Sequence, residues 1–227
     1  MKHFTIFRDF YRIIAEMTEE EIVSTIGSSK YQFMIEDIRR SFQEQGEKVA
    51  NEKKKELPSV TFSASYRGGR SNATLIRYQG YIVIRILSLA RGCEHTRIAF
   101  ISPKGMGLKI VVRVCRPDGT LPETIQEIED FHTAAYNKIA SFYARLCEVE
   151  IDTSGQDVGR TCLFSHDPNI YFNPDASAFI VDQPPIFYKS QKKKKVSEKK
   201  KQEIAQGSHP MSEETALNYH SSHAALM

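Results

Sequence analysis

The chain of 227 residues lacks the features that mark membrane, secreted and zinc-binding proteins. No apolar run approaches the roughly 20 residues that cross a bilayer. The amino terminus has no long apolar stretch followed by a small-residue cleavage site, so we expect a cytoplasmic protein with no membrane partner. Four cysteines occur without a C-x-x-C pair, at positions 93, 115, 147 and 162. Their spacing predicts neither a zinc site nor a disulfide framework, and we expect reduced cysteines, mostly packed in the core.

The net positive charge of the chain comes from one short segment. The whole chain has a net charge of +3, but residues 189–201 contain eight lysines and one glutamate. The remainder therefore has 23 basic and 27 acidic residues, a net charge of −4, and we interpret the globular part as mildly acidic. We predict a folded domain over residues 1–185 and a disordered lysine-rich tail or linker over residues 186–227. The basic overall composition is therefore no evidence that the folded domain itself binds DNA.

The apolar pattern predicts an α+β fold, with a mixed β-sheet flanked by helices. Residues 98–101 and 108–114 predict a hairpin across a glycine-containing turn. The other expected strands lie at 2–8, 61–65, 80–84, 148–151, 161–164 and 178–181.

Capping residues place the helices. Thr18 and Glu21 form a capping box that predicts a short helix ending near Gly27. A longer helix follows, becomes very polar, and stops before Pro58. The longest helix is expected at 122–146, where a second capping box of Thr120 and Glu123 precedes apolar residues spaced by three and four.

One candidate site is the turn between the hairpin strands, residues 102–109, with the sequence Ser-Pro-Lys-Gly-Met-Gly-Leu-Lys. Small residues let the backbone approach a ligand, and backbone N–H groups beside a hydroxyl and an ammonium suit a triphosphate. This predicts phosphate binding by Ser102, Gly105, Gly107 and Lys109. A plain hairpin with two turn glycines explains the same residues, and the spacing is not that of a Walker A loop.

A second candidate site follows a predicted strand and contains Asp152, Asp157 and Arg160. A carboxylate and an arginine in one loop can place a metal ligand beside a phosphate clamp. Two turn-forming aspartates with Arg160 as their salt-bridge partner explain the same loop. The nearby Ser165-His166-Asp167 is not a catalytic triad, because sequence neighbours do not align for proton relay merely by adjacency.

The tail is a candidate nucleic-acid contact. Counterion release would favour salt-sensitive, sequence-independent binding to phosphates, whereas a solubilising linker is the alternative. The tail cluster has no aromatic residues for base stacking. Its candidate residues are Lys192, Lys193, Lys194, Lys195, Lys199, Lys200 and Lys201.

Six segments occur in a fixed order: Leu57-Pro58, 66–70, 78–84, 102–109, Ile151-Asp152 with Asp157 and Arg160, and 165–168 with Tyr171 and Asn173. Together they resemble the VirE amino-terminal domain family, primase-like domains of bacterial mobile elements related to archaeo-eukaryotic primases. The resemblance spans about residues 2–181 and implies a core in which carboxylates hold divalent metals for nucleotidyl transfer. It implies that Asp152 is one such carboxylate and that Ser102, Lys109 and Arg160 bind triphosphate; we also assign His166 to nucleotide binding.

The chain departs from that family at the paired carboxylates. Arg85-Ile86-Leu87 stands where the family pattern has Asp-x-Asp. An arginine in place of a metal ligand reverses the local charge, so we expect no cofactor and no primer synthesis. Mg²⁺ or Mn²⁺ is expected only if activity survives at a degenerate catalytic site of Asp152 and Asp157. The connection 88–96 is also short where we expect a helix.

These observations predict a degenerate primase-like domain that binds nucleotide or single-stranded nucleic acid in mobile-element replication or transfer. The expected partners are single-stranded DNA or a nucleotide, and a helicase or other replication protein of the element. Two alternatives stay open. One is a non-catalytic interaction module or decayed copy, and the other is an active metal-dependent nucleotidyltransferase.

Overall fold

The computed structural model describes residues 2–86, 93–149, 151 and 155–182, which all belong to one compact unit, residues 1–183. The unit contains helices and two main β-sheets, which confirms the α+β class. The structure does not describe residue 185 or the residues after it. The predicted domain boundary and the predicted tail therefore stay predictions.

The smaller sheet has the strand order β2-β1-β3-β9, and every neighbouring pair is antiparallel. Its strands are β1 (Phe4–Arg8), β2 (Arg12–Met17), β3 (Ser59–Thr61) and β9 (Cys162–Leu163). The sequence predicts β1 and β9 but not β2. In the sheet's path β2 is an edge strand with mostly exposed residues, so it carries no buried alternation that a sequence pattern could reveal.

The larger sheet is built around β8 (Leu108–Cys115), which pairs antiparallel with both β6 (Tyr81–Ile86) and β7 (Thr96–Ile101). The predicted hairpin of β7 and β8 is confirmed. Two short strands extend this sheet: β10 (Tyr171–Phe172) pairs antiparallel with β7, and β11 (Phe179–Ile180) runs parallel to β8. A separate two-stranded sheet consists of β4 (Ala64–Tyr66) and β5 (Leu75–Tyr78).

Three helices lie between β2 and β3 in the chain. The capping box at Thr18 and Glu21 begins α1 (Glu19–Gly27) as predicted. The predicted longer helix is instead two helices, α2 (Gln32–Gln45) and α3 (Glu47–Lys54). They are separated at Gly46, whose φ of +86° is outside the helical range and is readily adopted by glycine. Short 3₁₀ turns occupy Ser29–Tyr31 and Asn72–Thr74.

The longest helix, α4 (Ile125–Cys147), begins later than predicted. Its capping box is formed by Thr124 and Glu127, so the predicted box of Thr120 and Glu123 is wrong. Thr120 is held instead by Asp118, whose carboxylate accepts hydrogen bonds from the Thr120 amide at 2.9 Å and hydroxyl at 2.7 Å. Such a local turn competes with helix initiation.

The strand predicted at 148–151 is also wrong for the residues described. Glu148 ends α4 in a left-handed conformation with a φ of +53°, and neither Val149 nor Ile151 belongs to a strand. Glu150 lies outside the described residues, as do residues 88–92 of the connection where a helix was expected.

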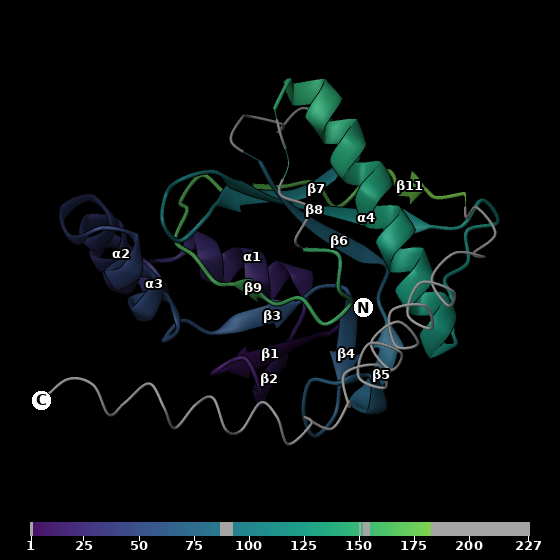
Figure 1. Cartoon of the computed structure of the whole chain (residues 1–227), viewed down its shortest axis with the longest axis horizontal. Coiled ribbons are helices and arrows are strands. Elements are labelled where there is room, and N and C mark those ends of the chain that lie inside the picture. The colour runs from purple at the N-terminus through teal and green to yellow at the C-terminus, as the bar shows by residue number, and fades with distance from the viewer. Residues whose placement is uncertain (1, 87–92, 150, 152–154, 183–227) are drawn as a thin grey trace, which may run out of the picture. The chain divides into compact units, whose positions relative to one another are not determined.

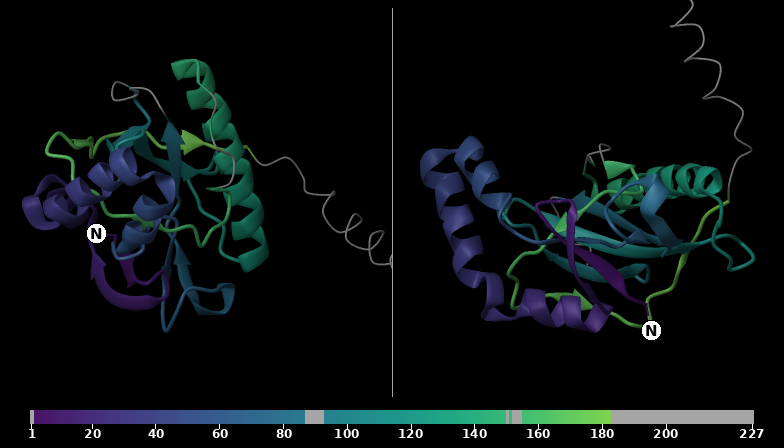
Figure 2. Two further views of the ribbon diagram at one scale, coloured as in Figure 1. Left: turned by 60° about the vertical axis from the view of Figure 1, so that its left-hand side comes forward. Right: turned by 90° about the horizontal axis from the view of Figure 1, so that it is seen from below.

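The two faces of the larger sheet pack against different partners. Ile84, Ile110 and Val112 share a core with Phe131 and Ile139 of α4. The alternate residues of the same strands belong to a second core that includes α1 and the smaller sheet, formed by Phe4, Ile22, Phe62, Tyr81, Phe100, Val111 and Phe164. Helices α4 and α1 therefore lie on opposite sides of the larger sheet (Figures 1 and 2).

The four cysteines are free, but only Cys162 is buried and the other three are partly exposed. Among the helices that the structure describes, none combines the length and apolar character needed to cross a bilayer.

Candidate phosphate-binding pocket

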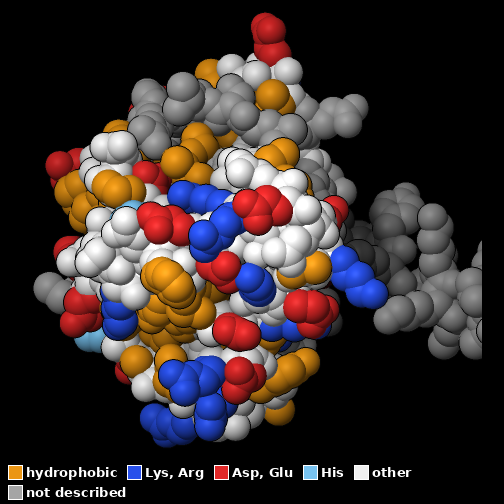
Figure 3. Space-filling model, turned by 90° about the vertical axis from the view of Figure 1, so that its left-hand side faces the viewer, with side chains coloured by type: hydrophobic (Ala, Val, Ile, Leu, Met, Phe, Trp, Pro, Cys, Tyr) orange, Lys and Arg blue, Asp and Glu red, His pale blue; other side chains and the backbone are white. Residues whose placement is uncertain are grey.

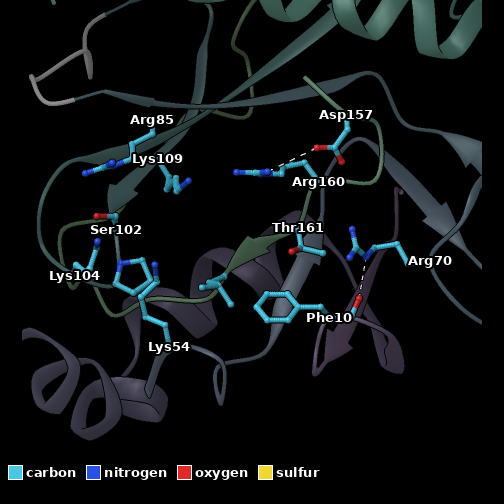
Figure 4. A pocket seen from close by; sticks show the side chains of 12 residues that line it. Phe10, Lys54, Arg70, Arg85, Ser102, Lys104, Lys109, Asp157, Arg160 and Thr161 are labelled. Carbon is cyan, nitrogen blue, oxygen red and sulfur yellow. Dashed lines mark hydrogen bonds and ion pairs between the residues drawn. The ribbon is translucent and has the colours of Figure 1, made fainter. Parts of the chain in front are cut away.

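A pocket of about 520 Å³ lies where strands of both sheets end beside α3 (Figure 4). Its lining contains six basic side chains and one carboxylate, Asp157, together with smaller polar and apolar groups. The basic residues come from six different places in the sequence: Lys54, Arg70, Arg85, Lys104, Lys109 and Arg160. The remaining lining residues are Phe10, Ser102, Pro103, Thr161 and Leu163.

Arg85 and Lys109 are brought together by the pairing of β6 with β8. The two residues are direct partners in the antiparallel register. Because side chains alternate along a strand, both lie on the face that carries Val111, toward the smaller sheet. Like charges directly opposite each other destabilise a strand pair, and a bound anion between them would offset that repulsion.

The guanidinium of Arg85 has one described partner, the Met106 carbonyl oxygen, at 3.1 Å. This contact links β6 to the turn between β7 and β8. It uses one N–H of a group that has five, so it leaves donors to hydrogen-bond a ligand.

Lys54 and Lys104 form the side of the pocket nearest α3. Burial lowers the pKa of the Lys54 ammonium, and three neighbouring cations of the pocket lower it further. The Lys104 ammonium pairs with the carboxylate of Glu47 and lies 5.2 Å from the centre of the Phe42 ring. A negative ligand would stabilise the charged form of Lys54, because it would reduce the repulsion among these ammonium groups.

Arg160 lies in the loop before β9, next to Thr161. Its guanidinium is 3.9 Å from the Asp157 carboxylate, and both side chains are more than half exposed. An exposed pair at this separation contributes little to stability. Arg160 is therefore available for a ligand, and Figure 4 shows its side chain directed toward Lys109.

Arg70 connects two segments that line the opposite wall of the pocket. Its Nε donates to the Phe10 carbonyl oxygen at 2.9 Å, and its guanidinium also donates to the Gly159 carbonyl oxygen. These bonds connect the turn between β1 and β2 to the loop that carries Arg160.

The structure brings together four of the residues that the sequence singled out: Ser102, Lys109, Asp157 and Arg160. Asp152 and the seven tail lysines lie outside the described residues. The site assignment therefore stays a prediction for those positions.

Gly105 and Gly107 do not line the pocket. The Gly105 amide donates to the Ser102 carbonyl oxygen at 2.8 Å, and the Gly107 carbonyl oxygen accepts from the Ser102 amide at 2.8 Å. Gly105 has a φ of +77°, which a non-glycine residue rarely adopts. The turn-forming role that we considered for the two glycines explains these contacts without a ligand.

His166 is also absent from the pocket lining. It is buried, and its Nδ1 is 2.9 Å from the Ser28 carbonyl oxygen. On either side of it, the Ser165 hydroxyl donates to the Ile101 carbonyl oxygen at 2.6 Å, and an Asp167 oxygen accepts from the Ile101 amide at 2.9 Å. The segment 165–167 thus fastens a loop to the end of β7, and its residues do not form a proton relay.

Five basic or aromatic residues of the pocket lining were not assigned to the site from the sequence: Phe10, Lys54, Arg70, Arg85 and Lys104. Phe10 and Lys54 have no motif around them, Arg70 was noted only within the segment 66–70, and Lys104 was noted only as part of a turn. Arg85 was noted as a lost carboxylate rather than as a gained cation. Its position opposite Lys109 was not predicted, because the expected strand 80–84 ended before Arg85 and the only pairing expected for 108–114 was the hairpin with 98–101.

The fold and the pocket together define an α+β domain with a concave, strongly basic site. The family model for the BT4734-like, N-terminal domain matches residues 52–172, more than half of the chain, so the chain belongs to that family. Every lining residue except Phe10 falls within the matched range. Searches of curated proteins and of solved structures found no significant match.

The family match corrects the resemblance drawn from the sequence. The chain matches the BT4734-like family and not the VirE amino-terminal domain family, so that assignment was wrong. The primase-like and mobile-element expectations depended on that resemblance and are withdrawn with it, whereas the expected helicase partner is not tested and stays a prediction. Of the short segments that suggested it, residues 165–167 fasten a loop to the end of β7, and residues 81–84 lie in β6.

Proposed function

We propose that this chain is a binding protein for a phosphate-bearing ligand, a nucleotide or single-stranded nucleic acid, held in the basic pocket. A cytoplasmic location is part of the proposal. The observation that carries it is the convergence of six basic side chains and one carboxylate on a cavity of about 520 Å³. Pockets for small molecules fall in this size range.

The charge of the pocket is local. Residues 1–185 carry 23 basic and 24 acidic residues, so this part of the chain is nearly neutral rather than mildly acidic. On the face that carries α2 and α3, basic and acidic side chains are interspersed around an apolar patch (Figure 3). The excess of cations in the pocket is therefore a feature of the site and not of the composition.

The chemistry of the lining suits phosphate. Arginine presents a planar fork of donors to phosphate oxygens, and lysine adds a compact positive charge. The repulsion between Arg85 and Lys109 and the lowered pKa of Lys54 are costs that a bound anion would reduce. Ser102 and Thr161 add hydroxyl groups that can hydrogen-bond a phosphate.

Metal-dependent catalysis is not part of the proposal. Among the described residues, no group of three or more His, Cys, Asp or Glu side chains is arranged to hold a metal ion. Asp157 is the carboxylate of the pocket, and Asp152 is outside the described residues. The expectation of a ligand bound without a cofactor stays a prediction, and titration in the presence of a chelator checks it.

The test measures binding of a fluorescent single-stranded oligonucleotide and of a nucleoside triphosphate to the full chain. Arg160→Ala and Lys109→Met should each weaken binding by about fivefold or more, because each removes a charge-assisted contact of roughly 1 kcal/mol or more. Arg40→Ala is a matched control, since Arg40 is an exposed arginine that also pairs with an aspartate three residues away.

A variant of the full chain with the eight lysines of residues 189–201 replaced by glutamine separates the tail from the pocket. For the oligonucleotide, loss of one phosphate contact should reduce the slope of log affinity against log salt by about 0.7. The proposal fails if Arg160→Ala and Lys109→Met behave like Arg40→Ala. It also fails if all binding disappears with the tail lysines.

A further inference from the structure

The aromatic ring of Phe10 enters the basic pocket from the turn between β1 and β2. Figure 4 shows the ring on the side opposite Lys54, Lys104 and Arg85. Phe10 is partly buried and is the one aromatic residue among the lining residues. The pocket therefore combines a flat apolar surface with a set of cations.

The ring is not part of the hydrophobic core. The clusters of buried residues, and the partly buried residues packed against them, do not include Phe10. Within the described part of the chain it forms no ring pair with another aromatic side chain, whereas Phe4 and Phe7 of the neighbouring strand do. Packing of the core thus does not explain why a phenylalanine stands at this position.

The backbone at this turn is unusual for such residues. Asp9 and Phe10 both have positive φ angles, 55° and 62°, and the Tyr11 amide donates to the Arg8 carbonyl oxygen at 3.3 Å. A bulky residue with positive φ is uncommon, and such conformations persist where surrounding contacts fix them. Two contacts hold this turn, which are its own Tyr11–Arg8 hydrogen bond and the hydrogen bond that Arg70 donates to the Phe10 carbonyl oxygen.

The same Arg70 side chain also binds the Gly159 carbonyl oxygen, next to Arg160. One side chain thereby links the turn that carries the aromatic ring to the loop that carries a phosphate-binding candidate. The backbone at Phe10 and the backbone next to Arg160 are therefore held by the same side chain.

We infer that Phe10 is a stacking surface for an unpaired base, so that the ligand class of the pocket is a nucleotide, free or at a single-stranded position, with its phosphates on the cations. This inference rests on the proposed phosphate-binding function and adds the base to it. A base in a duplex has both faces covered by its neighbours and cannot stack on Phe10. Base–aromatic stacking is tolerant of sequence, because every base has a π-face.

The test compares a nucleoside triphosphate with inorganic triphosphate, using the full chain with the eight lysines of residues 189–201 replaced by glutamine so that they do not contribute. We expect the nucleoside triphosphate to bind at least about tenfold more tightly than inorganic triphosphate. Phe10→Leu should reduce that ratio to within about twofold while leaving the affinity for inorganic triphosphate unchanged. Phe33→Leu, at a highly exposed phenylalanine of α2 outside the pocket, is the matched control and should leave both affinities as they are.

A second measurement reports the contact directly. The chain contains no tryptophan, so Phe10→Trp introduces a single fluorescent indole at the site. Stacking on a base should quench its emission when the nucleoside triphosphate binds, and inorganic triphosphate should not. This readout also shows that the variant is folded and binds ligand.

The outcomes distinguish an error in the stacking role of Phe10 from an error in the proposed phosphate-binding function. If inorganic triphosphate binds but Phe10→Leu leaves the preference for the nucleoside unchanged, or if the wild-type protein has no such preference, the stacking role is wrong and the phosphate-binding function stands. Equal weakening of both ligands by Phe10→Leu also overturns the stacking role. If neither ligand binds, the proposed function itself is wrong and the stacking role with it.

Discussion

His132 predicts a specific sensitivity of the fold to acid. It lies in α4 with 3% of its surface exposed, and its Nδ1 is 3.0 Å from the hydroxyl oxygen of Tyr78. The imidazole also lies in a T-shaped contact with the Tyr78 ring. Burial lowers the pKa of His132 from 6.5 to about 4, so the residue is neutral in the folded protein at every pH above that value.

The sign and size of the effect follow from proton linkage. Below pH 6.5 the unfolded chain binds a proton at this histidine, whereas the folded chain does so only near pH 4. The stability associated with the neutral form is therefore present above pH 6.5 and is lost as the pH falls toward 4. The loss is about 1.4 kcal/mol per pH unit in that window, or roughly 2 kcal/mol between pH 7 and pH 5.

The assay is urea denaturation of the wild-type chain and of His132→Gln at pH 7, 6 and 5. Carboxylates that titrate at low pH contribute equally to both proteins, so the difference between the two free energies of unfolding isolates His132. We expect the wild type to lose about 2 kcal/mol more than the variant over this range. Parallel pH dependences would refute the reasoning, whatever the stability of the variant at pH 7.

Three further predictions concern single contacts. Glu19→Ala should destabilise the fold by about 3–5 kcal/mol in chemical denaturation, because it leaves the guanidinium of Arg97 buried without its carboxylate. Glu52→Ala, which removes the exposed pair with Lys55, should cost less than about 1 kcal/mol. Burial lowers the pKa of Lys2 to about 8. Between pH 8 and 9.5 the folded chain therefore releases a proton that the unfolded chain retains, so the thermal midpoint of unfolding should rise over this range. Lys2→Met should flatten that rise. Arg70→Lys should weaken the binding of both a nucleoside triphosphate and inorganic triphosphate severalfold, because lysine cannot hold the Phe10 and Gly159 carbonyl oxygens together in the planar geometry of arginine.

Local signals in the sequence predict local structure well. The capping box at Thr18 and Glu21 begins α1 because the hydroxyl and carboxylate satisfy amides within one turn of chain. The same reasoning fails at Thr120, where Asp118 two residues earlier offers a competing turn. A capping motif thus indicates a helix nearby, but the residue at which the helix begins depends on which of the competing local hydrogen bonds is stronger.

The pocket was only partly predictable, for a geometric reason. Lys109 and Arg160 lie at the ends of predicted strands, so the sequence marks them as candidates. Phe10 and Lys54 reach the same cavity only because β1 lies beside β3 in the smaller sheet and α3 ends next to the larger one. Side chains that meet through such long-range packing leave no spacing pattern in the sequence.

The distribution of charge argues for a ligand that enters the pocket rather than one that lies across the surface. With residues 1–185 nearly neutral and charges of both signs mixed on the α2–α3 face, a long polyanion gains little attraction from that face. Within the pocket, by contrast, six basic side chains line a single cavity of about 520 Å³, so their charges converge on whatever occupies it. A single nucleotide or a single-stranded end has the size to exploit this local field, whereas a rigid duplex presents its phosphates on the outside of a wide cylinder. The position of Arg85 fits the same conclusion, since a cation opposite Lys109 is unfavourable to the empty sheet and becomes favourable once a compact anion lies between them.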